Sequence, residues 1–164
     1  MNEAYYEVMV SRKKSAVMKM IQIVAVIMTV LSVLAFILGM MWGLILAVVF
    51  GVISYFLKLF NNVEYEYLYV DKELQIDRIL AKNSRKRMET IDLNEFEVLA
   101  PIRSHELDGY RNRNLKKADY SSGEEGIENK VYMLVVNDKQ IIFEPTEEMV
   151  KTVKMFAPRK VFTY

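Results

Sequence analysis

The chain has 164 residues, of which 26% are charged and 52% hydrophobic, with a formal net charge of +1 and no cysteine. A charge this close to zero argues against a nucleic-acid binder, whose domain is normally clearly basic. The absence of cysteine excludes disulfides, thiolate metal ligands and a cysteine nucleophile. The length allows one ordinary domain, or a membrane anchor followed by a soluble domain of about a hundred residues.

An apolar run of 38 residues begins at Met20, ends at Leu57 and contains no charged residue. As one straight helix it would be about 57 Å long, nearly twice the ~30 Å hydrocarbon core of a bilayer. Two spans of about 20 residues with a turn near Gly39 fit a bilayer better. The sequence therefore predicts a transmembrane hairpin with spans at about 17-38 and 42-60.

The flanks of this run predict its orientation in the membrane. Basic residues precede it at Arg12, Lys13, Lys14 and Lys19, Lys58 closes it, and the turn between the spans has no charge. By the positive-inside rule, both termini are expected in the cytoplasm. The run is far longer than the ~7–15 apolar residues of a signal peptide, so we expect a retained anchor. The sequence thus predicts a multi-pass protein of the cell membrane with two spans.

Small residues recur every four positions in the second span, at Gly43, Ala47 and Gly51. This spacing lets helix backbones approach each other closely. The face that these residues form can pack against the first span within the hairpin, or it can pair between copies of the protein. No ionisable residue lies within the apolar run, and such residues are the usual marker of an ion path or transport site. A transporter is therefore not expected.

The N-terminal segment, residues 1-16, contains a β-prone cluster from Tyr5 to Val10 ahead of its basic residues. This cluster either forms part of a tail or pairs with the soluble domain as an added strand, and the sequence favours neither. Only four residues separate Lys58 from the first strand signal, so this linker reaches at most about 14 Å. The soluble domain, residues 61-164, is therefore expected close to the membrane surface.

Alternating apolar residues predict that this domain is mainly β. Strand-like runs extend over residues 63-70, 74-80, 88-93, 96-102, 131-136 and 141-143, with turns at Asp71-Lys72 and Asn137-Asp138. Thr146 and two following glutamates indicate the start of a helix, and Pro158 ends it. We expect this amphipathic helix to plug the open end of a curved sheet. The polar stretch 103-129 is too long for a routine hairpin, and we expect it to be an inserted loop.

Two segments resemble membrane-anchored bacterial PH-like domains. Tyr67 to Ile76 is similar to their opening hairpin, and Arg85 to Leu93 is similar to their next strand, in which a basic turn leads into an apolar run. The resemblance covers about residues 17-160 and extends to a family of short bacterial membrane proteins with two transmembrane helices followed by a PH-like domain. It implies an antiparallel sheet or partly open barrel, capped by one C-terminal α-helix, after the hairpin. It implies no particular activity.

Two basic segments of the soluble domain are the candidate binding sites. The first lies in a predicted inter-strand turn, where PH-like domains often bind partners or phosphates, and the second lies in the polar loop. Their residues are Arg85, Lys86, Arg87, Arg111, Arg113, Lys116 and Lys117. These residues are candidates for contact with the lipid bilayer through anionic head groups, or with a membrane protein partner. The loop could instead balance its own charge with the acids near it.

Ser104, His105 and Glu106 are the residue types of a hydrolase triad, but adjacent residues in one loop rarely converge into that geometry. A metal site would need ligands beyond the carboxylates of Asp108 and Asp119, and no glycine-rich phosphate motif occurs. We therefore expect no catalytic, metal or cofactor site. The sequence predicts a non-enzymatic scaffold or sensor that presents a PH-like domain at the cytoplasmic face of the membrane. The alternatives are an assembly subunit of a larger membrane complex and, with less support, an enzyme that uses His105.

Overall fold

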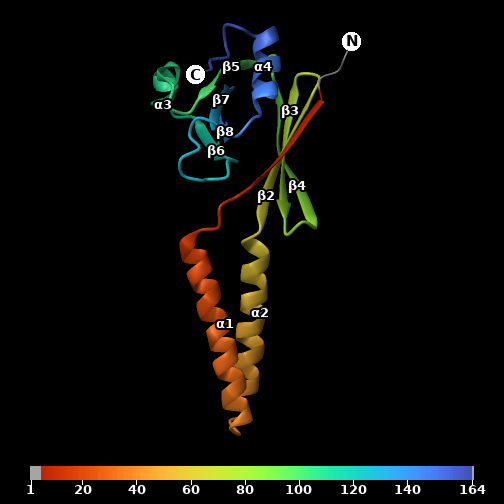
Figure 1. Cartoon of the computed structure of the whole chain (residues 1–164), viewed down its shortest axis with the longest axis vertical. Helices are drawn as coiled ribbons and strands as arrows, with labels where there is room; N and C mark the ends of the chain where they lie inside the picture. Colours follow the sequence, from red (N-terminus) through yellow and green to blue (C-terminus); the bar gives the residue numbers. More distant parts are fainter. Residues whose placement is uncertain (1–4, 164) are drawn as a thin grey trace. The chain divides into compact units, whose positions relative to one another are not determined.

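The computed structural model describes residues 5–163 and contains a pair of apolar helices and a β-rich unit (Figure 1). The contacts between residues divide the chain into these two units. The helical unit contains residues 14–63 and 80–83, and the β-rich unit contains residues 5–13, 64–79 and 84–163. The β-rich unit is therefore assembled from segments on both sides of the helices, and each unit is described by itself below.

Helices α1 (Ala16–Ile37) and α2 (Trp42–Phe60) lie side by side and are joined by a tight turn (Figure 1). Gly39 follows the end of α1 with a φ of +90°, a conformation that glycine adopts without the steric cost of a Cβ atom. The amides of Gly39 and Met40 donate to carbonyl groups in the last turn of α1, both at 3.0 Å, which is a Schellman ending. The two predicted apolar helices are confirmed, with the turn at the predicted place.

Two of the three predicted small residues lie against α1. A Cβ atom added to Gly43 would lie 2.5 Å from the backbone N of Phe36 and 2.7 Å from the carbonyl O of Ser32. At Gly51 the nearest atom to such a Cβ would be Cγ2 of Thr29, at 3.9 Å. The helices therefore meet backbone to backbone at Gly43, within one hairpin, which is one of the two packing arrangements that the sequence left open.

The remaining surface of the helices is largely exposed and apolar. Ala47 is half-buried, and large side chains such as Trp42, which is 77% exposed, cover the outside of the pair. The mean hydropathy of the most apolar stretch is 2.6 in α1 and 2.2 in α2, and both helices are long and apolar enough to cross a membrane. An uncovered apolar surface of this extent is unusual in water.

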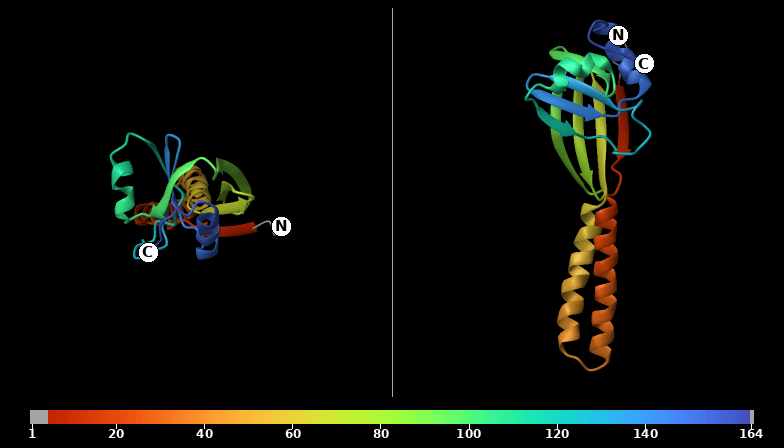
Figure 2. Two further views of the ribbon diagram at one scale, coloured as in Figure 1. Left: turned by 90° about the horizontal axis from the view of Figure 1, so that it is seen from above. Right: turned by 90° about the vertical axis from the view of Figure 1, so that its left-hand side faces the viewer.

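The first sheet of the β-rich unit has the strand order β1-β2-β3-β4 (Figures 1 and 2). Its strands are β1 (Tyr5–Ser11), β2 (Val63–Val70), β3 (Glu73–Leu80) and β4 (Ser84–Asp92). β1 pairs antiparallel with β2, from Tyr5 opposite Val70 to Ser11 opposite Glu64. The β-prone cluster at the N-terminus is thus an added strand. The β-rich unit therefore includes β1 in addition to strands of the predicted domain 61-164, because the helical hairpin is inserted between two neighbouring strands.

The second sheet has the strand order β5-β7-β8-β6. Its strands are β5 (Phe96–Pro101), β7 (Tyr132–Val136), β8 (Lys139–Phe143) and β6 (Lys116–Asp119). β5, β7 and β8 pair antiparallel, whereas β6 runs parallel to β8. β6 was not predicted, because its residues are polar and mostly exposed and it is held by backbone pairing at a sheet edge. Within the described chain the two sheets do not join into a closed barrel.

Helix α4 (Glu147–Phe156) packs on the core between the sheets. Thr146 caps it, with its hydroxyl oxygen accepting from the amide of Met149 at 3.3 Å, as predicted. Met149, Val150 and Val153 are buried against leucines of both sheets, and the void between them is only about 10 Å³. The core also contains an edge-to-face contact of the Tyr67 ring with that of a phenylalanine on β8, with centroids 5.6 Å apart. The amphipathic C-terminal helix is therefore confirmed.

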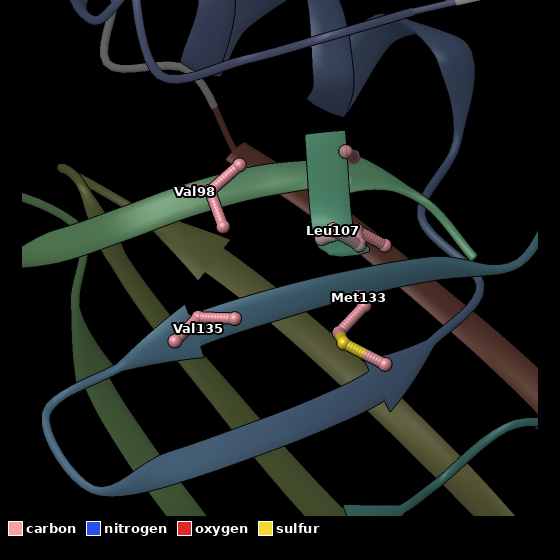
Figure 3. Close-up of a cluster of buried hydrophobic side chains, with 5 residues drawn as sticks. Val98, Leu107, Met133 and Val135 are labelled. Carbon is pink, nitrogen blue, oxygen red and sulfur yellow. The ribbon is translucent and has the colours of Figure 1, made fainter. Parts of the chain in front are cut away.

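A second apolar cluster lies on the opposite face of the second sheet (Figure 3). Val98 on β5 and Met133 and Val135 on β7 alternate with the residues that face the core between the sheets. Leu107, from the short 3-10 helix η1 (His105–Leu107), covers them and is fully buried. The stretch 103-129 is therefore not a simple polar loop, because it supplies a cover for this sheet. Helix α3 (Asp108–Arg111) follows η1 directly.

Candidate functional site

The basic segment Arg85-Lys86-Arg87 lies inside strand β4, near its start, rather than in a turn. The turn between β3 and β4 falls just before it, where Ala81 and Lys82 have φ values of +49° and +63°. β4 is an edge strand of the first sheet, a position at which natural sheets commonly carry long charged side chains. The predicted turn position is thus wrong by a few residues.

Two buried carboxylates on neighbouring strands bind the two arginines of this segment. Nη2 of Arg85 donates to Oε1 of Glu66 on β2 at 2.6 Å, and Nε of Arg87 donates to Oδ1 of Asp77 on β3 at 3.2 Å. Arg85 Nε also lies 3.9 Å from Oδ2 of Asp77. Glu66 is 3% exposed and Asp77 is 5% exposed, whereas both arginine side chains are more than half exposed. We call these four residues the charged cluster.

The charged cluster lies on the outward face of the first sheet. Tyr65 and Tyr67 on β2 are buried, and Tyr67 packs in the core, so Glu66 between them points to the opposite side. Arginine side chains can lie along a surface while their guanidinium groups stay in water. Arg85 and Arg87 contact Glu66 and Asp77 in this way and so contribute to the burial of both acids. The sequence offered no signal for Glu66 or Asp77, because the partner of a strand residue depends on the register of the sheet.

Burial is the main cause of a raised pKa at Glu66. Arg85 acts in the opposite direction and lowers the pKa of this carboxyl, while the nearby carboxylate of Glu7 raises it further. The arginine charge is therefore used within the protein to hold a carboxylate that burial would otherwise tend to neutralise.

The arginines of the second basic segment also have partners within the protein. Arg111 donates to the carbonyl O of Ile102 at 2.6 Å, and Arg113 donates to Oε2 of Glu97 at 2.8 Å. The guanidinium carbon of Arg113 lies 5.3 Å from the centre of the Tyr110 ring. These contacts attach the segment after η1 to the second sheet.

Three lysines of the predicted binding residues remain: Lys86, Lys116 and Lys117. All three are exposed, and within residues 5–163 none has an ion pair. Lys86 lies on β4 of the first sheet, and the other two lie on β6 of the second sheet. The structure therefore separates the seven predicted residues into four arginines with internal partners and three lysines whose charges are available to an external anion.

The residues of the suspected triad make local contacts. His105 is 86% exposed, and its Nε2 lies 3.2 Å from Oε1 of Glu106. The hydroxyl oxygen of Ser104 accepts from the amide of Glu106 at 3.3 Å, which caps η1. No group of three or more histidines and acids in the described part of the chain is placed to hold a metal ion.

Comparison with known proteins gives a family. A family model described as "Bacterial PH-like domain (DUF6106)" matches residues 2–163. No curated protein and no solved structure matches the chain. The matched range includes α1 and α2 as well as both sheets, so the helical hairpin is part of the family pattern. The chain therefore belongs to the bacterial PH-like domain family DUF6106.

Proposed function

We propose that this protein is an integral protein of the bacterial cell membrane that holds a PH-like unit at the cytoplasmic face as a non-enzymatic scaffold or sensor. The observation that carries this proposal is the insertion of the helical hairpin between the paired strands β1 and β2. Residues 12–15 connect β1 to α1 and residues 61–62 connect α2 to β2. At about 3.5 Å per residue these tethers reach about 14 Å and about 7 Å.

Both tethers are short, so the length of chain alone keeps the PH-like unit within reach of the helix ends to which they connect. A PH-like unit attached in this way acts close to the ends of the helices, and its ligand has to be reachable there. This suits a protein that positions a binding surface.

The apolar surface of the helices supports a membrane location. Burial of apolar surface stabilises by about 25 cal/mol per Å², and the exposed apolar side chains of α1 and α2 gain this only in lipid or against another apolar surface. Arg12, Lys13, Lys14 and Lys58 flank the hairpin and favour the cytoplasm for both tethers. The PH-like unit would then face the anionic leaflet, where each lysine near the surface contributes about 1 kcal/mol.

Replacement of the hairpin by a tight turn tests this proposal. Ser11 lies opposite Glu64, so the removal of residues 12–63 and closure with Asn-Gly would make a two-residue β-hairpin loop. We expect the full chain to float with membranes and to resist extraction at alkaline pH, and the shortened chain to stay in the soluble fraction with a β-rich circular dichroism spectrum. A full chain extracted at alkaline pH would contradict the membrane anchor. A folded shortened chain that still floats with membranes would show that the hairpin is not the anchor.

A further inference from the structure

Strand β1 is an edge strand with one unpaired side. It pairs with β2, and within residues 5–163 no other backbone hydrogen bond reaches residues 5–11. Its seven residues pair without a bulge and include no proline and no lysine. Bulges, prolines and lysines usually protect natural edge strands, because an unprotected edge is a template for another strand. β1 therefore has the properties of a docking edge.

A groove begins beside the end of this strand. It has a volume of about 1060 Å³, and Val10 on β1 contributes to its wall. Tyr132 at the start of β7 and Val150 on α4 contribute apolar surface, and the segment at Lys130 forms another side. We call this space the edge groove. An extended chain added to β1 would have a groove of mixed polar and apolar lining next to it that can receive a side chain.

Three lysines and two glutamates line the edge groove, so its wall has a small excess of positive charge. Lys130, Lys151 and Lys154 line it and are exposed. In the described part of the chain no carboxylate lies within 4 Å of Lys130 or Lys154, while Lys151 lies 3.7 Å from Oε2 of Glu147. The other acid in the wall, Glu144, accepts from the amide of a serine at 2.6 Å and so has a partner. Two ammonium groups thus remain for acidic groups from outside.

We propose that the free edge of β1 binds an extended, acidic segment of a partner protein by strand addition. The backbone of the segment would pair with β1, its carboxylates would contact Lys130 and Lys154, and an apolar side chain would enter the edge groove. This inference rests on the scaffold function proposed above and names its class of partner. A second copy of β1 fits less well, because it would bring Glu7 as its only charge to two lysines.

The test uses the full chain in detergent micelles and a fluorescein-labelled peptide with the repeat Val-Thr-Glu-Thr, which places valine and glutamate on the same face of a strand. One control peptide carries N-methyl groups on alternate amides, which removes backbone pairing, and a second has lysine in place of glutamate. The protein variants are the double substitution Lys130→Glu with Lys154→Glu, and Lys116→Glu with Lys117→Glu as a charge-matched control outside the groove. Fluorescence anisotropy measures binding, and hydrogen exchange measures the protection of the β1 amides.

We expect the acidic peptide to bind and to slow exchange in β1, and both control peptides to bind at least about tenfold more weakly. The Lys130/Lys154 double variant should weaken binding by a similar factor, and the Lys116/Lys117 double variant should not. Absence of binding up to about 1 mM would overturn the proposal. Binding that neither N-methylation nor the Lys130/Lys154 double variant weakens would also overturn it. Concentration-dependent protection of β1 without peptide would assign the edge to a second copy instead. In each case the flotation result for the hairpin stands separately, so failure here leaves the membrane anchor intact.

Discussion

Arg85 reaches across strand β3 to bind Glu66 on β2, with a hydrogen bond of 2.6 Å from Nη2 to Oε1. Glu66 is almost completely buried although it lies on the outward face of its sheet. The pair therefore connects two strands that are not neighbours, and Asp77 on the strand between them joins the same charged cluster. Arginine residues that the sequence indicated as ligand contacts thus have a structural task.

Arg85→Ala should destabilise the β-rich unit. Loss of the guanidinium leaves Glu66 buried with an uncompensated charge, and because Arg85 is more than half exposed we expect a loss of only about 1–2 kcal/mol in the free energy of unfolding. Lys86→Ala on the same strand is the matched control and should have little effect. The stability of both variants is measured by denaturant unfolding of the full chain in micelles, followed by hydrogen exchange in β2 and β4. Equal stability of the two variants would contradict a structural role for Arg85.

Glu66 should make stability depend on pH. Burial raises the pKa of Glu66 above its ordinary value of 4.5, so the folded state keeps this proton at pH values where the unfolded chain has released it. The contribution of Glu66 is therefore complete below pH 4.5 and is lost as the pH rises through the raised pKa. We expect the stability of Glu66→Gln relative to the natural protein to increase across this range. Parallel pH profiles of the two proteins in denaturant unfolding would contradict this shift.

Binding to anionic vesicles should depend on the lysines rather than on the arginines. Lys86→Gln removes a free positive charge and should weaken association of the full chain, held in neutral-lipid nanodiscs, with phosphatidylserine-containing vesicles by about fivefold. Arg113→Gln, at a residue that already binds Glu97, should change it less. Cosedimentation measures both variants. A larger effect of the arginine variant would contradict this prediction and would indicate that the arginines contact the lipid head groups.

The close contact of the two helices makes a sharp prediction at Gly43. A methyl group at Gly43 would overlap the backbone of α1, whereas one at Gly51 would only reach ordinary contact distance. We expect Gly43→Ala to destabilise the hairpin by about 1–3 kcal/mol and Gly51→Ala to be nearly neutral. The single tryptophan, Trp42, lies next to Gly43 and reports the change by fluorescence during unfolding in detergent. A neutral Gly43→Ala variant would show that the helices do not approach this closely.

Local patterns allowed much of this fold to be predicted. The uncharged run defined both helices, Gly39 marked their turn, and the cap at Thr146 marked the last helix, because each feature depends on residues close in sequence. β6 and the burial of Leu107 could not be predicted in this way. β6 is held by pairing with a strand more than twenty residues away, and Leu107 is a single apolar residue within a polar stretch.

The candidate site shows the same limit of sequence reasoning. Arg85 was found because basic residues cluster in sequence, but its partner Glu66 lies two strands away and depends on how β2, β3 and β4 are aligned. The sequence therefore indicated where charge is concentrated and not how much of it is neutralised. The free lysines could be separated from the paired arginines only once the ion pairs were known.

Labelling of single cysteines tests the central claim most directly, because the natural chain has none. Met41→Cys places a thiol in the exposed turn between α1 and α2, and Ser84→Cys places one at the exposed start of β4. In intact cells, a maleimide that cannot cross membranes should label Met41→Cys, and it should label Ser84→Cys only after the cells are permeabilised. Labelling of Ser84→Cys in intact cells, or of both positions only after permeabilisation, would contradict a hairpin that crosses the membrane with the PH-like unit in the cytoplasm.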